Sequence, residues 1–176
     1  MNYYLVGYMY CGKTTFGRQL AQEKGMDYLD LDRAFEARYH YTVPMFFQRF
    51  GEQAFRTLES QLLRSTAELD NCVIATGGGT PCHSGNMDFI LQHGTAIYLQ
   101  MSADALVQRA LRSRNPRPLM QGLSHEEMRL RIETQLKERE PVYLRAPIIL
   151  DGNNPELPEI PDHPGAPEPP ELPEKS

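Results

Sequence analysis

Residues 7–15 read GYMYCGKTT, and this stretch decides how the remainder of the chain is interpreted. From Gly7 to Thr14 it matches the pattern G-x-x-x-x-G-K-[ST], whose glycines form a tight loop that leads directly into a helix. The apolar run before it predicts a strand at Tyr3–Val6, and the amphipathic run after it predicts a helix at Lys13–Lys24. The unpaired N–H groups and the positive dipole end of such a helix favour an anion. The stretch therefore predicts a phosphate-binding loop.

Tyr10 is the unusual residue of this loop, because nucleotide-binding loops often place glycine there to let the backbone turn. If the φ angle of Tyr10 is positive, the bulky side chain costs on the order of 1 kcal/mol relative to glycine. The other functional residues of the pattern are present: Lys13 can reach the β- and γ-phosphates, and the Thr14 hydroxyl can bind Mg²⁺. We therefore expect phosphate binding to persist, with the Tyr10 ring near the mouth of the site.

Short apolar runs alternate with helical patterns along the chain, which is typical of a parallel sheet covered by helices on both faces. The predicted strands are Tyr3–Val6, Tyr28–Leu31, Cys72–Ala75, Ala96–Leu99 and Ile148–Leu150. The predicted helices are Lys13–Lys24, Leu31–Tyr39, Val43–Phe50, Glu52–Leu69, Asn86–His93, Ala103–Arg112 and His125–Arg139. Since 176 residues are too few for two ordinary domains, we expect one α/β domain with a parallel five-stranded sheet.

Residues 155–176 differ from the rest of the chain in composition. They hold eight of the 14 prolines and six acidic residues against one lysine, so the whole net charge of −5 lies there. Residues 1–154 carry equal numbers of acidic and basic side chains, which offers no global field for nucleic acid or an anionic membrane. We predict a domain at 1–154 and a disordered, acidic, proline-rich tail at 155–176.

The three cysteines, Cys11, Cys72 and Cys82, are odd in number and lack the C-x-x-C spacing of a zinc site. They suit a reducing compartment better than a disulfide framework. No apolar run approaches the roughly 20 residues that span a bilayer, and the N-terminus has no signal-peptide pattern. We therefore expect a monomeric cytoplasmic protein that binds neither membrane nor nucleic acid.

The phosphate loop binds a phosphoryl donor but does not identify the acceptor. Three further stretches carry information on the acceptor: YLDLD at 28–32, FRTLE at 55–59 and TGGGTP at 76–81. In their order and spacing after the phosphate loop, the chain resembles the shikimate kinase family from about Tyr3 to about Asp151. The resemblance implies a three-layer α/β/α P-loop NTPase fold of the nucleoside monophosphate kinase type, with a mobile lid. It also implies a Mg²⁺-dependent transferase that moves the γ-phosphoryl group of ATP to the 3-hydroxyl of shikimate, on the route to chorismate and the aromatic amino acids.

Two carboxylates, Asp30 and Asp32, lie at alternate positions at the end of the second predicted strand. Period two would place both on one side, at the edge where open parallel sheets bind ligands. By the resemblance, Asp30 acts with Thr14 near Mg²⁺, through water, and Asp32 hydrogen-bonds the reacting hydroxyl of shikimate. The alternative for Asp32 is a helix N-cap ahead of residues 33–39.

The resemblance assigns the carboxylate of shikimate to Arg56 and Arg139. It places the ring of shikimate on three successive glycines, Gly77, Gly78 and Gly79. Arg56 and Glu59 share a helix face because they are three residues apart, so Glu59 can orient the guanidinium. Without the resemblance, this pair would be read as a surface ion pair worth under about 1 kcal/mol, and the glycines as a flexible turn.

Arg117, in the predicted lid at about 113–123, resembles the family arginine that folds over the donor phosphates. In related phosphoryl transfers, a guanidinium that approaches as negative charge develops on the phosphoryl oxygens increases the rate by roughly 10³-fold or more. Arg109 resembles the residue that stacks on adenine, and Asn153 lies in a loop that could contact the same base. The predicted catalytic residues are Asp32, Lys13 and Arg117. The predicted ATP-binding residues are Gly7, Tyr10, Cys11, Gly12, Lys13, Thr14, Thr15, Arg109, Arg117 and Asn153.

The chain departs from the family pattern after Ile148–Leu150, where the tail replaces a final helix. This departure bears on adenine affinity and stability more than on the chemistry. Two other functions stay open. A kinase for another small hydroxy acid, such as gluconate, would share the loop and the fold. A non-catalytic nucleotide or metabolite sensor is suggested by Tyr10 and the altered terminus.

Overall fold

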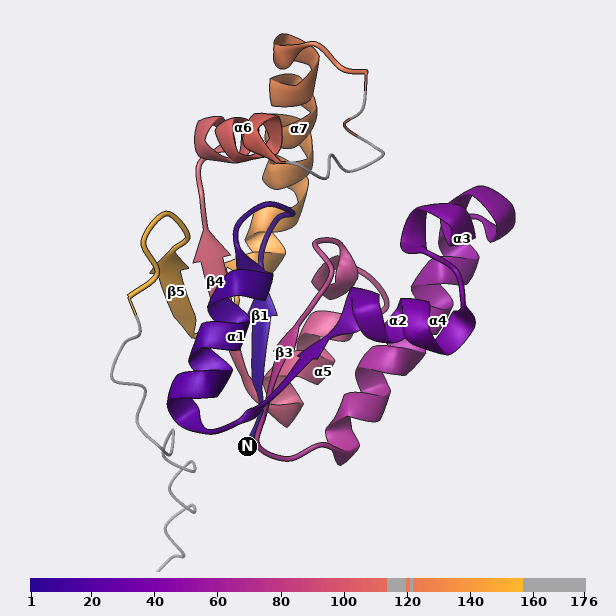
Figure 1. Ribbon diagram of the computed structural model, residues 1–176, viewed down its shortest axis with the longest axis vertical. Helices are drawn as coiled ribbons and strands as arrows, with labels where there is room; N and C mark the ends of the chain where they lie inside the picture. Colours follow the sequence, from indigo (N-terminus) through magenta and orange to yellow (C-terminus); the bar gives the residue numbers. More distant parts are fainter. Residues whose placement is uncertain (114–119, 121, 157–176) are drawn as a thin grey trace, which may run out of the picture.

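The computed structural model describes residues 1–113, 120 and 122–156. Within them, five parallel strands form one sheet in the order β2-β3-β1-β4-β5, which confirms the predicted α/β class (Figure 1). The strands are β1 Tyr3–Val6, β2 Asp27–Asp30, β3 Cys72–Ala75, β4 Thr95–Gln100 and β5 Ile148–Asp151. The helices are α1 Lys13–Lys24, α2 Leu31–Tyr39, α3 Val43–Phe50, α4 Glu52–Ser65, α5 Asn86–His93, α6 Ala103–Arg112 and α7 His125–Tyr143, with 3-10 turns η1 Thr66–Glu68 and η2 Thr80–Cys82.

β1 is the central strand of the sheet. All four of its residues are buried, and it pairs with β3 on one side and β4 on the other. A continuous apolar run, rather than an alternating one, fits a parallel strand that is covered on both faces. Because the phosphate loop follows β1 directly, it begins at the middle of the carboxyl edge of the sheet, between the ends of its neighbours.

Successive side chains of β1 point to opposite faces and identify the helices on each face. Leu5 faces α1, since a Cβ atom added to Gly17 would lie 2.8 Å from Leu5 Cδ1. Tyr4 faces the other way, where its ring meets Phe89 of α5 at a centroid distance of 6.5 Å. Helices therefore cover both faces of the sheet, and the predicted three-layer arrangement is confirmed (Figure 1).

α7 is longer than the sequence analysis predicted. The predicted helix ended at Arg139, whereas the observed helix passes through Pro141 and ends at Tyr143. Proline removes one helical hydrogen bond. Only two residues follow it, however, and the fully buried Tyr143 packs on Tyr98 of β4 with ring centroids 5.2 Å apart. Burial of this aromatic ring offsets the lost bond and extends the helix.

Other boundaries also differ from the prediction: β4 is one residue longer at each end, β5 is one residue longer at its end, and β2 begins one residue earlier. The predicted helix Glu52–Leu69 ends at Ser65, because the Thr66 hydroxyl donates to Leu63 O at 2.6 Å and the chain tightens into η1. β2 ends one residue before its predicted end, because Leu31 already begins α2. The earlier end of β2 changes where the side chains of Asp30 and Asp32 point.

α2, α3 and α4 form a helical lobe beside the β2 edge of the sheet (Figure 1). An aromatic cluster holds the lobe together: the Phe35 ring lies 5.1 Å from the Phe46 ring and 4.9 Å from the Phe55 ring. Aromatic pairs at such distances contribute about 0.5–1.5 kcal/mol beyond burial of their area. Since Phe55 directly precedes Arg56, the cluster positions the part of α4 that carries this predicted site residue.

Part of the predicted organisation lies outside the described residues. Of the predicted lid at 113–123, only Ser113, Met120, Gly122 and Leu123 are described, and Arg117 is not. The tail beyond residue 156 also lies outside. The lid, its arginine and the tail therefore stay predictions. In the described ranges, no helix combines the length and apolar character needed to cross a membrane.

Candidate active site

The loop from Gly7 to Gly12 joins the end of β1 to the start of α1. Gly12 caps the helix with a φ angle of 97°, a left-handed conformation that favours glycine. It has no side chain that could bond the first amides of α1, and the first turn contains no acidic residue. The helix therefore presents N–H donors and its positive end to an anion, as the sequence pattern predicted.

The ammonium group of Lys13 lies inside this loop. Its Nζ donates to Gly7 O at 2.7 Å and to Tyr8 O at 2.9 Å, and lies 3.6 Å from Cys11 Sγ. The side chain is buried. A buried positive charge is costly unless it is paired, and two carbonyl dipoles meet it only in part. A phosphate on the loop would supply the missing negative charge.

Tyr10 adopts a φ angle of 70°, the positive value for which backbone strain was expected. The left-handed conformation costs a bulky residue on the order of 1 kcal/mol. Such strain persists where the surroundings hold the backbone in place. Here Arg109 Nη1 donates to Tyr10 O at 3.2 Å, which ties the strained residue to α6.

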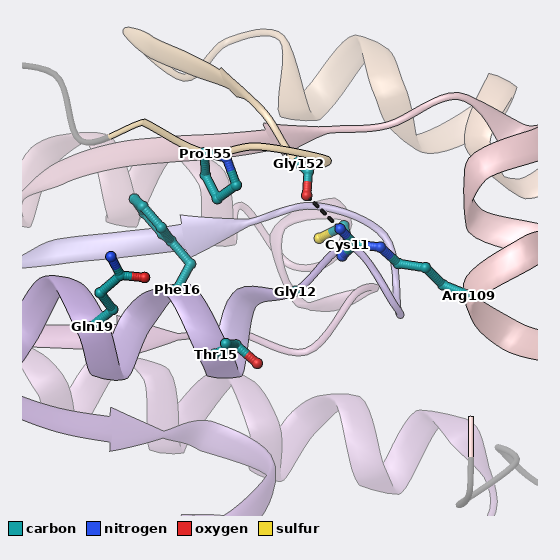
Figure 2. A pocket seen from close by; sticks show the side chains of 8 residues that line it. All are labelled: Cys11, Gly12, Thr15, Phe16, Gln19, Arg109, Gly152 and Pro155. Carbon is teal, nitrogen blue, oxygen red and sulfur yellow. Dashed lines mark hydrogen bonds between the residues drawn. The ribbon is translucent and has the colours of Figure 1, made fainter. Parts of the chain in front are cut away.

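A pocket of about 350 Å³ lies beside the phosphate loop (Figure 2). Arg109 is at its edge, where Nη2 donates to Gly152 O at 2.7 Å, so its guanidinium connects the loop with the turn after β5. The pocket is lined by Cys11, Gly12, Thr15, Phe16, Gln19, Arg109, Gly152 and Pro155. Its place beyond the phosphate loop suits the base of a nucleotide.

The residues that line this pocket differ in two ways from the predicted ATP-binding residues. Four lining residues, Phe16, Gln19, Gly152 and Pro155, were not among the predicted ATP-binding residues, although the first two continue the helix face of Gly12 and Thr15. Asn153, which was predicted, is not among the lining residues. Its backbone N and its Nδ2 donate to Asp151 Oδ1 at 2.8 and 3.0 Å. A role for Asn153 toward adenine stays a prediction.

Thr14 and Asp30 meet at the start of α1, where Thr14 Oγ1 donates to Asp30 Oδ2 at 3.3 Å. Asp30 also caps α2, because its Oδ1 accepts from Arg33 N at 3.2 Å. The alternative that Asp32 is this N-cap is therefore wrong. So is the period-two argument that placed Asp30 and Asp32 on one side, since the chain is already helical at Leu31.

The pair fits a Mg²⁺ ion that also contacts phosphate. Hydroxyl and carboxylate oxygens are its preferred protein ligands, and it usually keeps several waters. In the described part of the chain, no cluster of three or more His, Cys, Asp or Glu side chains could hold a metal by itself. Beside this pair, the Tyr28 hydroxyl is buried and has no hydrogen-bond partner in the described structure. The donor set and this orphaned group both fit an ion that brings water and phosphate with it.

The three glycines after β3 form a ledge on which the predicted acceptor residues meet. A Cβ atom added to Gly77 would lie 3.1 Å from Asp32 Oδ1, and one added to Gly79 would lie 2.6 Å from Arg56 Nη2. One added to Gly78 would lie 3.7 Å from Arg139 Nη1. A side chain at Gly77 or Gly79 would therefore displace Asp32 or the Arg56 guanidinium, so these glycines have a role beyond flexibility of a turn.

The predicted contact between Arg56 and Glu59 is present, with Arg56 Nη1 donating to Glu59 Oε2 at 2.8 Å. Arg56 Nε and Nη2 also lie 3.4 Å from Glu52 Oε1. The Arg56 and Glu59 side chains are only 15% and 5% exposed, so this is not the surface ion pair of the alternative interpretation. Burial raises the pKa of Glu59, while the Arg56 charge and a hydrogen bond from Thr80 act in the opposite direction.

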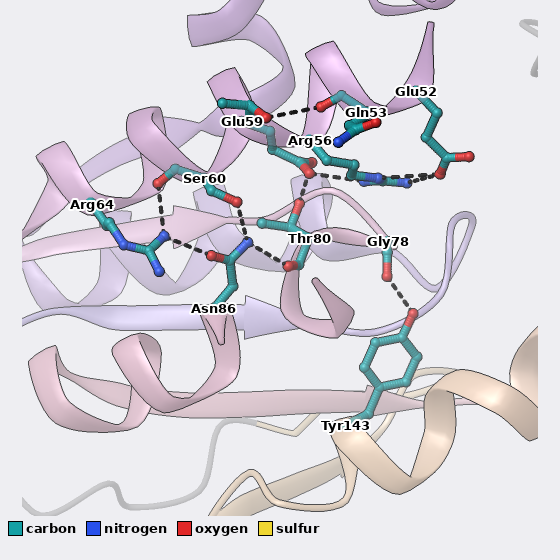
Figure 3. A network of polar contacts seen from close by, with 11 residues as sticks. Glu52, Gln53, Arg56, Glu59, Ser60, Arg64, Gly78, Thr80, Asn86 and Tyr143 are labelled. Carbon is teal, nitrogen blue, oxygen red and sulfur yellow. Dashed lines mark hydrogen bonds and ion pairs between the residues drawn. The ribbon is translucent and has the colours of Figure 1, made fainter. Parts of the chain in front are cut away.

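A buried polar network supports the ledge from behind and was not predicted (Figure 3). Thr80 Oγ1 donates to Glu59 Oε1 at 2.5 Å. Asn86 Nδ2 donates to Ser60 Oγ at 3.0 Å and to Thr80 O at 2.8 Å, and its Oδ1 accepts from Arg64 Nη1 at 2.9 Å. The network ties η2 to α4. No sequence pattern points to it, because Asn86 lies 22 and 26 residues from its α4 partners.

α7 forms the far wall of the ledge and carries Arg139. The guanidinium of Arg139 lies over the Tyr8 ring, with Cζ 5.7 Å from the ring centroid. Tyr8 in turn donates to Gln135 Oε1 at 2.6 Å, and Tyr143 donates to Gly78 O. Burial raises the pKa of Tyr143, so its hydroxyl remains a donor. α7 is thereby fastened to both the phosphate loop and the ledge.

The family model "SKI: Shikimate kinase" matches residues 9–161. The chain is 43% identical to the shikimate kinase of Parabacteroides distasonis over 148 residues, which is 84% of this chain and 86% of that protein. It is 38% identical to the shikimate kinase of Bacteroides thetaiotaomicron over 153 residues, 87% of each chain.

Solved structures agree with these sequence matches. The crystal structure of the Bacteroides thetaiotaomicron shikimate kinase superposes with a TM-score of 0.85 at 37% identity, covering 87% of each chain. The shikimate kinase of Acinetobacter baumannii, solved in complex with shikimate, superposes with a TM-score of 0.78 at 36% identity. That comparison covers 85% of this chain and 82% of the other.

Proposed function

We propose that this chain, which belongs to the shikimate kinase family, transfers the γ-phosphoryl group of ATP to the 3-hydroxyl of shikimate. The products are shikimate 3-phosphate and ADP. The domain that does this comprises residues 1–154 and acts as a monomer. Within it, the two halves of the site have separate tasks, one for the donor and one for the acceptor.

The donor half binds ATP through backbone amides and a positively charged side chain. The amides of residues 11–15 and the ammonium of Lys13 bind the phosphates, and the base lies in the pocket beside Arg109. Thr14, and Asp30 through water, would hold Mg²⁺, which when bound would supply positive charge near the β- and γ-phosphate oxygens. Arg117 would add a guanidinium to the same charge from the lid.

The acceptor half holds shikimate on the glycine ledge. Arg56, oriented by Glu59, and Arg139 bind the carboxylate of shikimate, because two guanidinium groups aimed at one ledge suit a single anion. Asp32 accepts a hydrogen bond from the 3-hydroxyl and turns its oxygen toward the γ-phosphorus. The new O–P bond forms as the bond to the β-phosphate oxygen breaks, and the hydroxyl proton passes to Asp32.

One observation carries this proposal: the acceptor ledge touches the phosphate loop. A Cβ atom added to Gly78 would lie 3.2 Å from Met9 N and 3.6 Å from Gly7 O. A molecule lying on the ledge is therefore next to the terminal phosphate of a nucleotide on the loop. Phosphoryl transfer requires mainly such proximity and alignment, because the transition state is loose and needs little proton removal.

ADP release, followed with shikimate, with gluconate or without an acceptor, tests the proposal. We expect release that depends on shikimate and on Mg²⁺, and phosphorus NMR should show a phosphate monoester on the product. Turnover confined to gluconate would reject the acceptor. Thermal stabilisation by nucleotide and shikimate without any turnover would support a sensor instead of an enzyme.

A further inference from the structure

Tyr28 carries a hydroxyl group that the fold does not use. In the described part of the chain, it is the one buried side-chain oxygen or nitrogen without a hydrogen-bond partner. The ring itself is well packed, since a Cβ atom added to Gly17 would lie 2.7 Å from its Cε2 and the Arg18 guanidinium lies 5.7 Å from its centroid. Phenylalanine would fill the same space without burying an unpaired polar group. Thr14 and Asp30 lie close enough to influence the pKa of Tyr28, but neither completes a hydrogen bond with its hydroxyl, which therefore has room for a further partner.

The position of this hydroxyl points to the partner. Tyr28 and Asp30 are two residues apart on β2, so their side chains lie on the same face of the sheet. Both face α1, the ring of Tyr28 against Gly17 and the carboxylate of Asp30 against Thr14. The orphaned group is thus next to the Thr14–Asp30 pair, on the side where the proposed function places Mg²⁺.

We propose that the Tyr28 hydroxyl is a positioning group of the Mg²⁺ site, accepting a hydrogen bond from a metal-bound water and donating one to Asp30. This inference rests on the proposed function. A water bound to Mg²⁺ uses its oxygen for the metal and acts as a donor, whereas a carboxylate is only an acceptor. A phenol does both, so it can stand between them. Asp30 has room for another donor beyond Thr14 and Arg33 N, because an ionised carboxylate offers about four lone-pair sites.

The substitution Tyr28→Phe removes the oxygen and leaves the ring. Unfolding temperature is measured without ligand and during a Mg²⁺ titration at fixed, saturating ADP, with no shikimate present. We expect the half-saturating Mg²⁺ concentration to rise about threefold to tenfold, the ratio that corresponds to one net hydrogen bond. The unfolding temperature without ligand should be unchanged or higher, and the affinity for ADP in the presence of EDTA should be unchanged.

Tyr4→Phe is the matched control, because the Tyr4 hydroxyl is also buried but already bonds Thr66 Oγ1 at 2.9 Å, far from the nucleotide. It should lower the unfolding temperature and leave the Mg²⁺ dependence as in the unmodified chain. Equal Mg²⁺ dependence in Tyr28→Phe and the unmodified chain would overturn the role of Tyr28 alone, as would an equal loss of ADP affinity in EDTA. No Mg²⁺ effect in the unmodified chain would overturn the proposed metal site, and the role of Tyr28 with it.

Discussion

The phosphate loop and the glycine ledge lie against each other at one edge of the sheet, yet they are constructed differently. The loop is one continuous stretch whose donors are mostly backbone amides, with Lys13 as its one buried cation in the described structure. The ledge brings together side chains from α2, α4 and α7, and a buried network behind it holds them. Donor binding should therefore tolerate most side-chain changes, whereas acceptor binding should respond to residues that never touch the acceptor.

The largest effect is expected at Lys13, whose buried positive charge lies inside the phosphate loop. Lys13→Met should lower kcat by about 10³-fold, because it removes the buried positive charge that faces the phosphates. Steady-state rates with saturating shikimate give the measurement. Lys24→Met, in the last turn of the same helix, is the control and should retain nearly full activity. Comparable losses in both variants would show that helix stability, not charge, was measured.

The next effect separates the two halves of the site. Arg56→Ala should raise KM for shikimate by roughly 10- to 100-fold, the range for hydrogen bonds between charged groups, with little change in KM for ATP. Arg49→Ala is the matched control, because this exposed arginine lies over Phe50 on the neighbouring helix α3, away from the ledge. Equal increases in both Michaelis constants for Arg56→Ala would count against a role specific to the acceptor.

A smaller effect is expected from a residue behind the ledge. Glu59→Gln keeps the shape of the side chain but removes the charge that orients Arg56, so KM for shikimate should rise about threefold to tenfold. Glu52→Gln should raise it less, since this exposed residue meets Arg56 only at 3.4 Å. If the order of the two variants were reversed, orientation of Arg56 through the buried carboxylate would be wrong.

Glu59→Gln should also change how the stability of the protein depends on pH. Burial raises the pKa of Glu59, so the folded state holds the proton more tightly than the unfolded chain does. The stability that protonation contributes is complete below the ordinary pKa of glutamate and is lost as the pH rises through the raised pKa. Glutamine cannot ionise, so it does not lose this contribution. In urea denaturation, the free energy of unfolding of Glu59→Gln should therefore increase relative to that of the unmodified chain as the pH rises through this window. A difference that is constant with pH would contradict the raised pKa.

The smallest effect is expected at Tyr10, whose ring the loop does not need. Tyr10→Gly relieves about 1 kcal/mol of strain but costs a similar amount in backbone freedom, so stability and KM for ATP should change little. Tyr10→Val should destabilise the protein and raise KM for ATP, because a β-branched residue fits a φ angle of 70° poorly. A large loss of nucleotide affinity in Tyr10→Gly would show that the ring, not the backbone, binds ATP.

The elements that could be predicted are those whose determinants are local. The strand, loop and helix of the phosphate site lie within 24 consecutive residues, and their observed bounds equal the predicted ones. The contact between Arg56 and Glu59 followed from helical spacing in the same way. Asp30 and Asp32 show the limit of such reasoning. A single residue of error at the end of β2 placed both carboxylates on one side and left Asp32 as the alternative N-cap, whereas Asp30 is the cap, because strand and helix orient side chains by different periods.

The sequence by itself determined the α/β class, the phosphate loop and the resemblance to one kinase family, because each depends on residues close together in the chain or on short motifs in order. Only the tertiary structure decided that Asn86 holds the ledge, that α7 continues through Pro141, and that the Tyr28 hydroxyl is buried unpaired beside Thr14 and Asp30. These features depend on which strands pair and which faces pack. Such contacts join residues far apart in sequence, and no local pattern records them.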